Sequence, residues 1–506
     1  MLPELIETAN LSETLDMAIP ARVRGTVWSV DSNCVEARGL AVPVGAVCKI
    51  ERIGQAPLPA QVIGFRGEAT LLASLDGTQG IAPGCAVHLE GAAATIRVGR
   101  ELQGRVIDAS GTAIDGGKAP ACITRTPLDR APIPAMQRPP ITQPLVTGVR
   151  AIDSMLTLGV GQRIGIFAGS GVGKSTLLGM IARGTDADVV VIGLVGERGR
   201  EVQEYLQREL SGPIRKKCVT VVATSDQPAL RRVQAAHTST SIAEYYRDQG
   251  KNVLLMMDSV TRFAMAQREI GLAAGEAPTT RGYPPSVFSM LPRLVERSGL
   301  GPKGSITGIY TVLVEGDDTN EPISDTLRGL LDGHIVLSRD IAQSGRYPAI
   351  NITSSLSRLQ AHIVAEDHLK SAAQLRKLLA IYQDNLDLIS IGAYQRGTSP
   401  EIDLAIAMNP AIEQFLAQPA TEKADWKNTV ARLREIFVAQ PVPANNLSNA
   451  TAGQTAIPSP PGATADNKMP TQPQRQQIQS IQNPANQSPT SQAAPEAGIP
   501  INLGAN

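Results

Sequence analysis

The sequence predicts an α/β protein built around a mostly parallel sheet, with a small β-barrel before this domain and a helical domain and a disordered tail after it. Three observations support this prediction. Strand and helix patterns alternate over residues 99–358, short β-rich segments punctuated by Gly and Pro precede them, and helical periodicity follows them.

The composition limits the classes of function. A chain of 506 residues is long enough for about three domains. Its 47 basic and 47 acidic residues balance, and only 2 Trp, 8 Tyr and 6 Phe could stack on bases, so we expect no nucleic-acid partner. The five cysteines follow no metal-ligand spacing, which favours reduced thiols in a cytoplasmic protein. The acidic N-terminus does not resemble a signal peptide and no apolar run could span a bilayer, so any membrane association should be peripheral.

The N-terminal part of the chain is expected to be mainly β-structure. Residues 1–20 are predicted to form one short helix. Residues 21–98 contain six or seven short segments of strand character, which predict a closed or nearly closed barrel. No cluster of reactive side chains occurs there, so we expect the barrel to serve packing and oligomer assembly rather than ligand binding.

The central domain is predicted over residues 99–358 and contains a proline-rich connection at 127–144, which fixes extended backbone. Its expected strands are 163–168, 188–196, 218–225, 252–258, 307–316, 334–338 and 348–355. The helices expected between them include 201–210, 228–249 and 284–298.

The C-terminal region from 359 to 440 reads as helices, expected at 368–389, 401–418 and 425–439. In the last of these, apolar residues recur at steps of three and four, which indicates a buried stripe first and a binding face only second. Residues 441–506 contain no aromatic residue and four charges. Such a segment buries too little apolar surface to offset its ordering entropy, so it is predicted to be disordered.

A glycine-rich turn, AGSGVGKST at residues 168–176, carries the most specific motif of the chain. It joins the apolar run RIGIFA to a helix, which is the context of a phosphate-binding P-loop. Gly169, Gly171 and Gly173 allow successive N–H groups to point at a polyphosphate, and the start of the helix adds its positive dipole end. The strict pattern opens with Gly where this chain has Ala168, and a plain glycine-rich turn is the alternative reading.

Two residues of the loop have predicted chemical roles. Lys174 would reach the terminal phosphates of a nucleotide such as ATP, and the hydroxyl of Ser175 would bind Mg²⁺. The other loop residues in the predicted binding set are Ser170, Val172 and Thr176.

Two carboxylates follow buried strands. Asp258 closes an apolar strand and is predicted to hold a magnesium-bound water, with helix capping as the alternative. Glu197 in GLVGERGRE comes just past another such strand, where a carboxylate can orient the water that attacks the γ-phosphorus. A salt bridge from Glu197 to Arg198 or Arg200 is equally compatible with the spacing. Arg198 and Arg262 are candidates for holding phosphate oxygens or Glu197 itself.

Two further candidates lie in SGRYPAINITSSLSRL, residues 344–359. Arg358 follows the last predicted strand, and a guanidinium aimed at the γ-phosphate would stabilise transition-state charge. Tyr347 could stack on adenine. The spacing alone favours a surface arginine and a core tyrosine.

With these motifs the chain resembles the type III secretion ATPases, the export motors of injectisomes and flagella, which are similar to the catalytic subunits of rotary ATP synthases. The resemblance runs from about residue 20 to about 440 and includes long blocks at 147–176, 275–299 and 313–339. It implies a RecA-like nucleotide-binding domain and an ATPase. It also implies that Glu197 is the catalytic glutamate, that Arg358 is supplied across a subunit interface, and that Tyr347 lies next to adenine.

The resemblance further implies a homohexamer at the cytoplasmic face of the inner membrane. The implied partners are a central stalk protein, a stator-like regulator, chaperone–effector complexes and the membrane proteins of the export gate. The implied function is to release chaperones from secreted proteins and help unfold these proteins for export. LISIGAYQRGTSPEIDLAI, residues 388–406, resembles injectisome more than flagellar members. A flagellar export ATPase and a rotary ATP synthase catalytic subunit are the alternatives.

Overall fold

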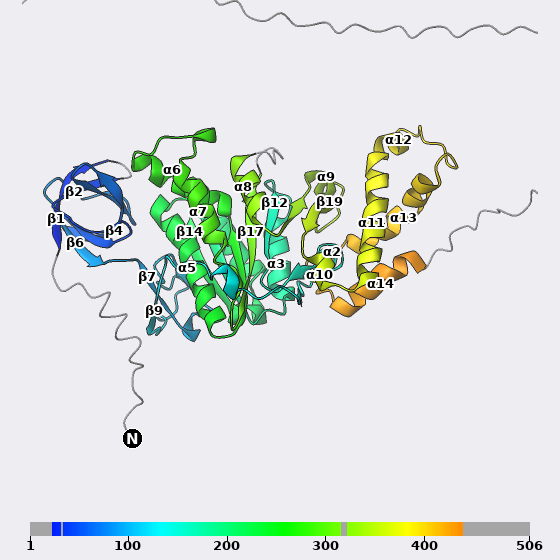
Figure 1. The fold of residues 1–506 in the computed structure, drawn as a ribbon, viewed down its shortest axis with the longest axis horizontal. Coiled ribbons are helices and arrows are strands. Elements are labelled where there is room, and N and C mark those ends of the chain that lie inside the picture. The colour runs from blue at the N-terminus through cyan, green and yellow to red at the C-terminus, as the bar shows by residue number, and fades with distance from the viewer. Residues whose placement is uncertain (1–22, 32–33, 315–320, 439–506) are drawn as a thin grey trace, which may run out of the picture. The chain divides into compact units, whose positions relative to one another are not determined.

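In the computed structural model, the described residues are 23–31, 34–314 and 321–438. The helix predicted over 1–20 and the tail predicted over 441–506 lie outside these residues. Most of the described chain belongs to a barrel, a central sheet covered by helices, and a C-terminal helical region (Figure 1). These are the parts that the sequence predicts.

Six antiparallel strands close the barrel in the order β1-β2-β5-β4-β3-β6. They are β1 (Arg24–Val30), β2 (Val35–Arg38), β3 (Val47–Arg52), β4 (Gln55–Arg66), β5 (Ala69–Ser74) and β6 (Ala86–Gly91). The segment Thr95–Val98, which the sequence suggests as a seventh barrel strand, is instead β7 and pairs with β9 (Thr124–Pro127). The barrel is closed by its six strands, so it has no free edge for another.

The central sheet has nine strands, eight of them in the order β19-β18-β12-β17-β15-β13-β14-β8, with β16 beside β17. Every pairing from β18 to β8 is parallel, whereas β19 and β16 pair antiparallel. The strands are β8 (Val106–Asp108), β12 (Arg163–Ala168), β13 (Val189–Glu197), β14 (Cys218–Thr224), β15 (Asn252–Asp258), β16 (Gly299–Leu300), β17 (Ser305–Leu313), β18 (Gly333–Leu337) and β19 (Ile350–Ser357).

Both faces of the sheet are buried, which explains why its strands are apolar throughout. Along β13, Val190 and Ile192 belong to one core and Val189 and Val191 to the other. The first core includes side chains of α2 (Arg150–Met155), α3 (Lys174–Gly184) and α4 (Gly199–Arg208). The second includes side chains of α5 (Ala229–Asp248), α6 (Val260–Ala273), α7 (Pro285–Val295) and α8 (Pro322–Leu330).

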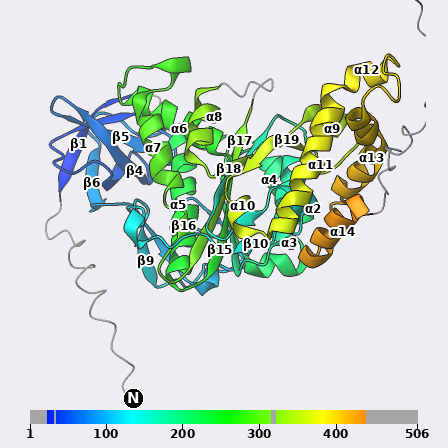
Figure 2. The same cartoon turned by 45° about the vertical axis from the view of Figure 1, so that its right-hand side comes forward.

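The C-terminal helices pack on one another and on α2 (Figure 2). They are α11 (Glu366–Asp384), α12 (Leu386–Ser390), α13 (Pro400–Leu416) and α14 (Trp426–Val438), with α9 (Arg339–Gln343) and α10 (Gln360–Ile363) before them. Leu433 is buried, and Ile436 and Phe437 are half-buried against the same core, so the predicted stripe of α14 is an internal contact. The C-terminal helices therefore share one core with the P-loop helix α3.

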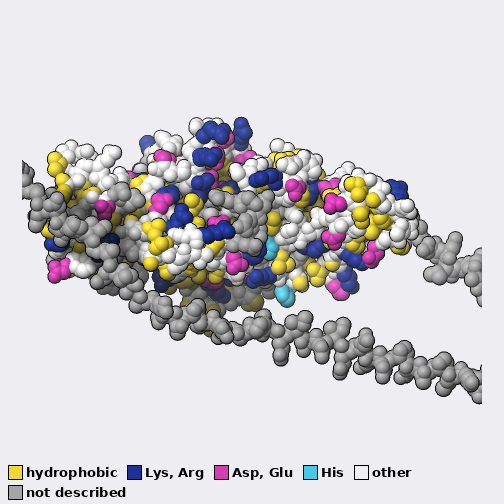
Figure 3. Space-filling model, turned by 90° about the horizontal axis from the view of Figure 1, so that it is seen from above, with side chains coloured by type: hydrophobic (Ala, Val, Ile, Leu, Met, Phe, Trp, Pro, Cys, Tyr) yellow, Lys and Arg dark blue, Asp and Glu magenta, His cyan; other side chains and the backbone are white. Residues whose placement is uncertain are grey.

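On the face seen in Figure 3, basic and acidic side chains occur along the whole surface. None of the helices in the described ranges is long and apolar enough to cross a membrane.

Candidate nucleotide-binding and hydrolysis site

The P-loop has the predicted strand, turn and helix geometry. β12 ends at Ala168 and α3 begins at Lys174. Between them Gly171 and Gly173 have φ angles of 81° and 94°, in the left-handed region where a side chain would be strained. The glycines at these two positions are therefore required by the backbone, which supports the choice of a P-loop over an ordinary turn.

Lys174 lies between two carboxylates. Its Nζ forms a close ion pair with Asp258 Oδ1 and a second one, at 3.5 Å, with Glu197 Oε1. Burial opposes the charge on the ammonium group, but the carboxylates of Asp258 and Glu197 outweigh it and raise the pKa of Lys174. The lysine is thus held protonated at the start of α3.

Asp258 ends β15 beside the loop, as predicted. It is buried, and Thr311 of the neighbouring strand β17 donates its Oγ1 hydrogen to Asp258 Oδ1 at 2.6 Å. Both strands are parallel and adjacent, so their carboxyl ends bring these side chains to the same edge of the sheet.

Glu197 ends β13 after an irregularity in the pairing with β14. The residue before it, Gly196, has a φ of 72°, and a Cβ there would lie 2.9 Å from Cδ of Arg262. Glycine at this position therefore lets Arg262 approach, and its Nε lies 3.4 Å from Glu197 Oε1. Burial raises the pKa of Glu197, and the positive charge of Lys174 partly offsets this effect.

The two predicted arginines differ in position. Arg262 contacts Glu197, whereas Arg198 is largely exposed and pairs with Glu201 on α4 at 3.2 Å. Arg200 likewise pairs with Glu204, at 2.6 Å. The salt bridges that the spacing left open for Glu197 are therefore formed with Lys174 and Arg262, and the structure does not bring Arg198 into this cluster.

Tyr347 and Arg358 lie at opposite ends of β19. The ring of Tyr347 lies over the P-loop, because a Cβ added to Gly173 would be 3.5 Å from its Cδ1 and Cε1 atoms. Tyr347 is half-exposed, so the core-tyrosine alternative is wrong. Arg358 is exposed and its backbone N–H donates to Asp332 O, at the start of β18. Since β18 runs parallel to β12, that is the edge of the sheet opposite the P-loop.

Comparison with known proteins identifies the family of this chain. The ATP synthase alpha/beta family, nucleotide-binding domain, matches residues 148–357, and the T3SS EscN ATPase C-terminal domain matches residues 364–435. The flagellum-specific ATP synthase of Bacillus subtilis is 51% identical over 433 residues, which are 85% of this chain and 99% of the relative. The type 3 secretion system ATPase of Xanthomonas euvesicatoria is 47% identical over 434 residues, 85% of this chain and 98% of the relative.

The chain belongs to the family of type III secretion and flagellar export ATPases. Its fold matches the solved structure of the assembled ATPase EscN in complex with its central stalk EscO, from the type III secretion system of enteropathogenic E. coli. The TM-score is 0.75 at 46% identity, over 81% of this chain and 99% of that one. The sequence-based family assignment, the three-part fold with its RecA-like domain and the ATPase activity are thereby confirmed.

One site residue of this ATPase was missed by the sequence reasoning. Thr311 is fully buried in β17 and donates to Asp258. The available signal was a threonine hydroxyl within the run IYTVL of a strand next to Asp258, where a buried polar side chain needs a partner.

The side chains present fit a magnesium nucleotide. The hydroxyl of Ser175 and the carboxylate of Asp258 are hard oxygen donors of the kind that Mg²⁺ prefers. Lys174 is next to Ser175 at the start of α3, and its ammonium group, now paired with Asp258 and Glu197, can pair with a phosphate instead. The cluster thus has the donor set and the sign of charge that a polyphosphate with its metal needs.

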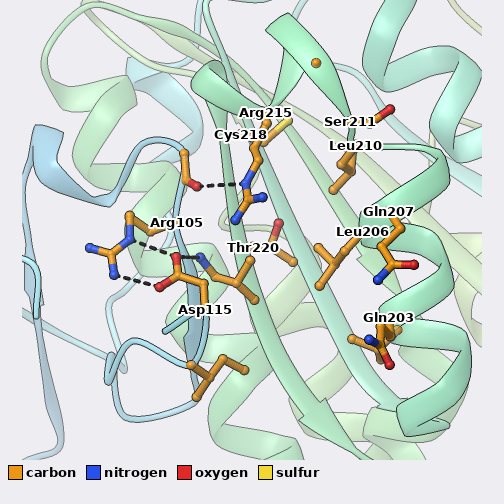
Figure 4. Close-up of a pocket in the computed structure, with 15 residues that line it drawn as sticks. Arg105, Asp115, Gln203, Leu206, Gln207, Leu210, Ser211, Arg215, Cys218 and Thr220 are labelled. Carbon is orange, nitrogen blue, oxygen red and sulfur yellow. Dashed lines mark hydrogen bonds and ion pairs between the residues drawn. The ribbon is translucent and has the colours of Figure 1, made fainter. Parts of the chain in front are cut away.

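A separate cleft of about 600 Å³ lies between β8 and α4 (Figure 4). Val202 and Leu206 of α4, with Leu210 just after the end of this helix, form its apolar wall, and the ion pair of Arg105 with Asp115 lies across from them. None of the predicted nucleotide-site residues lines this cleft, so it is distinct from the P-loop site.

Proposed function

We propose that this chain is the ATP-hydrolysing motor of a type III protein export apparatus. The observation that carries the proposal is the buried cluster of Lys174, Glu197 and Asp258 beside the P-loop. It occurs in a chain that is 47–51% identical to a flagellum-specific ATP synthase and a type 3 secretion system ATPase over 85% of its length.

Each side chain in the cluster has a role in the proposal. The P-loop amides from Gly169 to Thr176 cradle the phosphates, and Lys174 exchanges its carboxylate partners for the terminal phosphates. Mg²⁺, held by Ser175 and through water by Asp258, would neutralise charge on the phosphate oxygens. Glu197 orients the attacking water, and its raised pKa reflects the buried position that this role requires.

Arg358 acts on the nucleotide of a neighbouring subunit in this proposal. Within one chain it lies at the opposite edge of the sheet from the P-loop, and the six residues of β12 span about 20 Å at 3.3 Å per residue. A single chain therefore cannot bring its own Arg358 to its own P-loop, whereas a ring of identical subunits can. A homohexamer, with Tyr347 beside adenine and Arg262 supporting Glu197, fits these positions.

The finer steps of export are proposed from the resemblance to the family. We propose a peripheral position at the cytoplasmic face of the inner membrane. The proposed partners are a central stalk protein, as in the complex of EscN with EscO, a stator-like regulator, chaperone–effector complexes and the export gate. Hydrolysis at the subunit interfaces then drives chaperone release and unfolding of the secreted protein.

The test replaces the chromosomal copy with Lys174→Ala, followed by assays of effector secretion and swimming in the same cells. We expect loss of one of them. Lost secretion with normal swimming assigns an injectisome, and lost swimming assigns a flagellum. The chain is 51% identical to the flagellar relative and 47% identical to the type 3 secretion relative. Because these values are close, the assignment to an injectisome rather than a flagellum stays a prediction. If both functions survive, the export proposal is wrong.

A catalytic subunit of a rotary ATP synthase is the second candidate, because the matched nucleotide-binding domain is named for the ATP synthase alpha/beta family. Turnover by the purified chain alone favours the export motor, whereas a requirement for a second type of subunit favours the synthase.

A further inference from the structure

The turn that carries Tyr347 is held by the C-terminal helices. Arg346 forms an ion pair through Nε with Glu413 Oε2 of α13 at 2.8 Å. The carbonyl oxygen of Tyr347 accepts a hydrogen bond from the backbone N–H of Gln418 at 2.9 Å. Gln418 lies two residues beyond the end of α13. The position of the Tyr347 ring over the P-loop therefore depends on where the end of α13 lies.

The side chain of Gln418 fixes that end of α13. It is buried, and its Oε1 accepts the backbone N–H of Arg150 at 2.7 Å. Its Nε2 donates to Gly148 O and to Glu422 O, each at 2.9 Å. One amide thus joins the loop before α2 to the connection between α13 and α14, while its own backbone holds Tyr347.

Other contacts to the same connection come from the nucleotide-binding domain. The guanidinium of Arg150 donates to Phe415 O at 3.1 Å and to Ala417 O at 2.8 Å. Arg183, on the P-loop helix α3, donates to Ala420 O at 3.0 Å. These bonds anchor the connection, and among the residues that the structure describes it is the backbone N–H of Gln418 that joins the connection to Tyr347.

We propose that Gln418 is a positioning residue for the adenine of ATP and that it acts through Tyr347. This inference rests on the proposed role of Tyr347 beside adenine. It follows that Gln418 governs affinity for the base of the nucleotide and not for its phosphates. Its backbone N–H bonds Tyr347, and its side chain bonds Gly148, Arg150 and Glu422 rather than the P-loop amides or Lys174.

The test uses Gln418→Met in the full chain, since methionine has a similar length and removes both the donor and the acceptor. The substitution leaves the N–H of Arg150 without its partner, which frees the end of α13 to shift. We expect the KM for ATP to rise about 10-fold with kcat within about 2-fold of the wild type. The inhibition constant of inorganic tripolyphosphate, which has no base, should stay unchanged.

A matched control is Gln360→Met. Gln360 is also a buried glutamine, and it donates through Nε2 to Ser154 O at 3.3 Å, in α2. Within the described part of the chain it forms no hydrogen bond with Tyr347, so the KM of Gln360→Met for ATP should equal that of the wild type. If Gln418→Met does not fold, Gln418→Asn, which keeps the amide and shortens the side chain by one methylene, replaces it.

Tyr347→Ala separates the inference from the proposed function. We expect this variant to raise the KM for ATP and Gln418→Met to add no further change in the Tyr347→Ala background. A normal KM in Tyr347→Ala overturns both the role of Tyr347 and the inference. A raised KM in Tyr347→Ala with a normal KM in Gln418→Met overturns the inference alone. Equal losses of ATP and tripolyphosphate affinity in Gln418→Met also overturn it, because they indicate a general disturbance of the site.

Discussion

Lys174 keeps its charge in a site where burial alone would favour the neutral amine. Asp258 and Glu197 supply the compensation, and both must find another partner when a phosphate takes the lysine. For Asp258 the hydroxyl of Thr311 remains, and for Glu197 the guanidinium of Arg262 remains. Each carboxylate therefore keeps one polar partner within the protein after Lys174 has moved to a phosphate of ATP.

Glu197→Gln should separate binding from hydrolysis. The glutamine keeps the size of the side chain but cannot orient the attacking water as a carboxylate does, so we expect kcat to fall by about 100-fold or more while nucleotide affinity is kept. Steady-state hydrolysis and binding of a fluorescent ATP analogue measure the two properties.

The matched control for this prediction is Glu201→Gln, on α4. Glu201 pairs with the exposed Arg198 outside the buried cluster, so its removal should change kcat by less than about 2-fold. Equal losses in Glu197→Gln and Glu201→Gln would contradict the assignment of Glu197.

Asp153 makes the stability of the fold depend on pH. Its side chain is fully buried and accepts hydrogen bonds from the N–H and Oγ1 of Thr147 at 2.9 and 2.7 Å and from the N–H of Gly148 at 3.0 Å. Burial raises its pKa to about 7, and these bonds only partly oppose the shift. Between pH 4 and 7 the unfolded chain releases a proton that the folded chain keeps, so rising pH lowers the free energy of unfolding, by up to about 4 kcal/mol in total.

Asp153→Asn should remove this contribution. We expect the difference in unfolding free energy between the wild type and Asp153→Asn to shrink as the pH rises from 5 to 8. Only the wild type has a carboxyl group at this buried position, and only its stability falls as this group ionises. Urea unfolding at several pH values measures it. A difference that stays constant over this range would show that Asp153 is ionised in the folded protein throughout.

Local sequence was sufficient for most of the site. A P-loop and an acid at the end of an apolar strand are recognisable because parallel strands bring their carboxyl ends to one edge. Thr311 and Gln418 were not recognised, since their roles depend on partners 53 and 71 residues away, Asp258 and Tyr347. Arg198 and Arg262 have the same residue type, and the sequence does not reveal that the missing side chain at Gly196 leaves room for Arg262 beside Glu197.

At the scale of elements, the direction of β19 decides at which edge of the sheet Arg358 lies. The sequence predicts the strand but places Arg358 simply after its end, which in a parallel sheet would be the P-loop edge. Twelve residues, 338–349, separate β18 from β19, and they contain only the short helix α9. A parallel return normally uses a helix that runs back along the sheet, and α9, with five residues, is too short for this, in agreement with the antiparallel pairing.

Mixing two inactive variants tests the position of Arg358. Arg358→Ala keeps its P-loop and Lys174→Ala keeps its arginine, so interfaces that combine them regain one complete site. In a mixed ring at equal ratio about a quarter of the interfaces should be complete, and ATPase activity should return toward that fraction. Each variant alone is the control. Mixtures as inactive as the separate proteins, with subunit exchange verified, would contradict the arrangement in trans.

At the scale of the whole molecule, the closed barrel excludes one way in which subunits can associate, the pairing of strand edges. A closed barrel has no free strand edge, so one subunit cannot join the next by adding a strand to it. If the barrels contact one another in the proposed ring, residues on their surface would make the contacts; a candidate is the half-exposed Trp28, with Arg38 stacked on it at 3.6 Å from the ring centroid.

Assembly should control activity. If each site needs Arg358 from a neighbour, dilution to monomers removes turnover, so specific ATPase activity should rise with protein concentration and level off when rings have formed. Hydrolysis rates and sedimentation over the same concentrations measure this. Full specific activity in a sedimenting monomer would contradict a shared site.

In the proposed ring, β19 sets the spacing between neighbouring nucleotides. Tyr347, three residues before the first residue of β19, contacts the P-loop of its own subunit, and Arg358, directly after the last residue, would face the next subunit. The eight residues between Ile350 and Ser357 span about 27 Å at 3.4 Å each. Two residues inserted into the strand would preserve which side chains face inward but displace Arg358 by about 7 Å relative to Tyr347. The length of β19 therefore fixes the distance between Tyr347 and Arg358, and this distance must be the same at every site of the proposed ring.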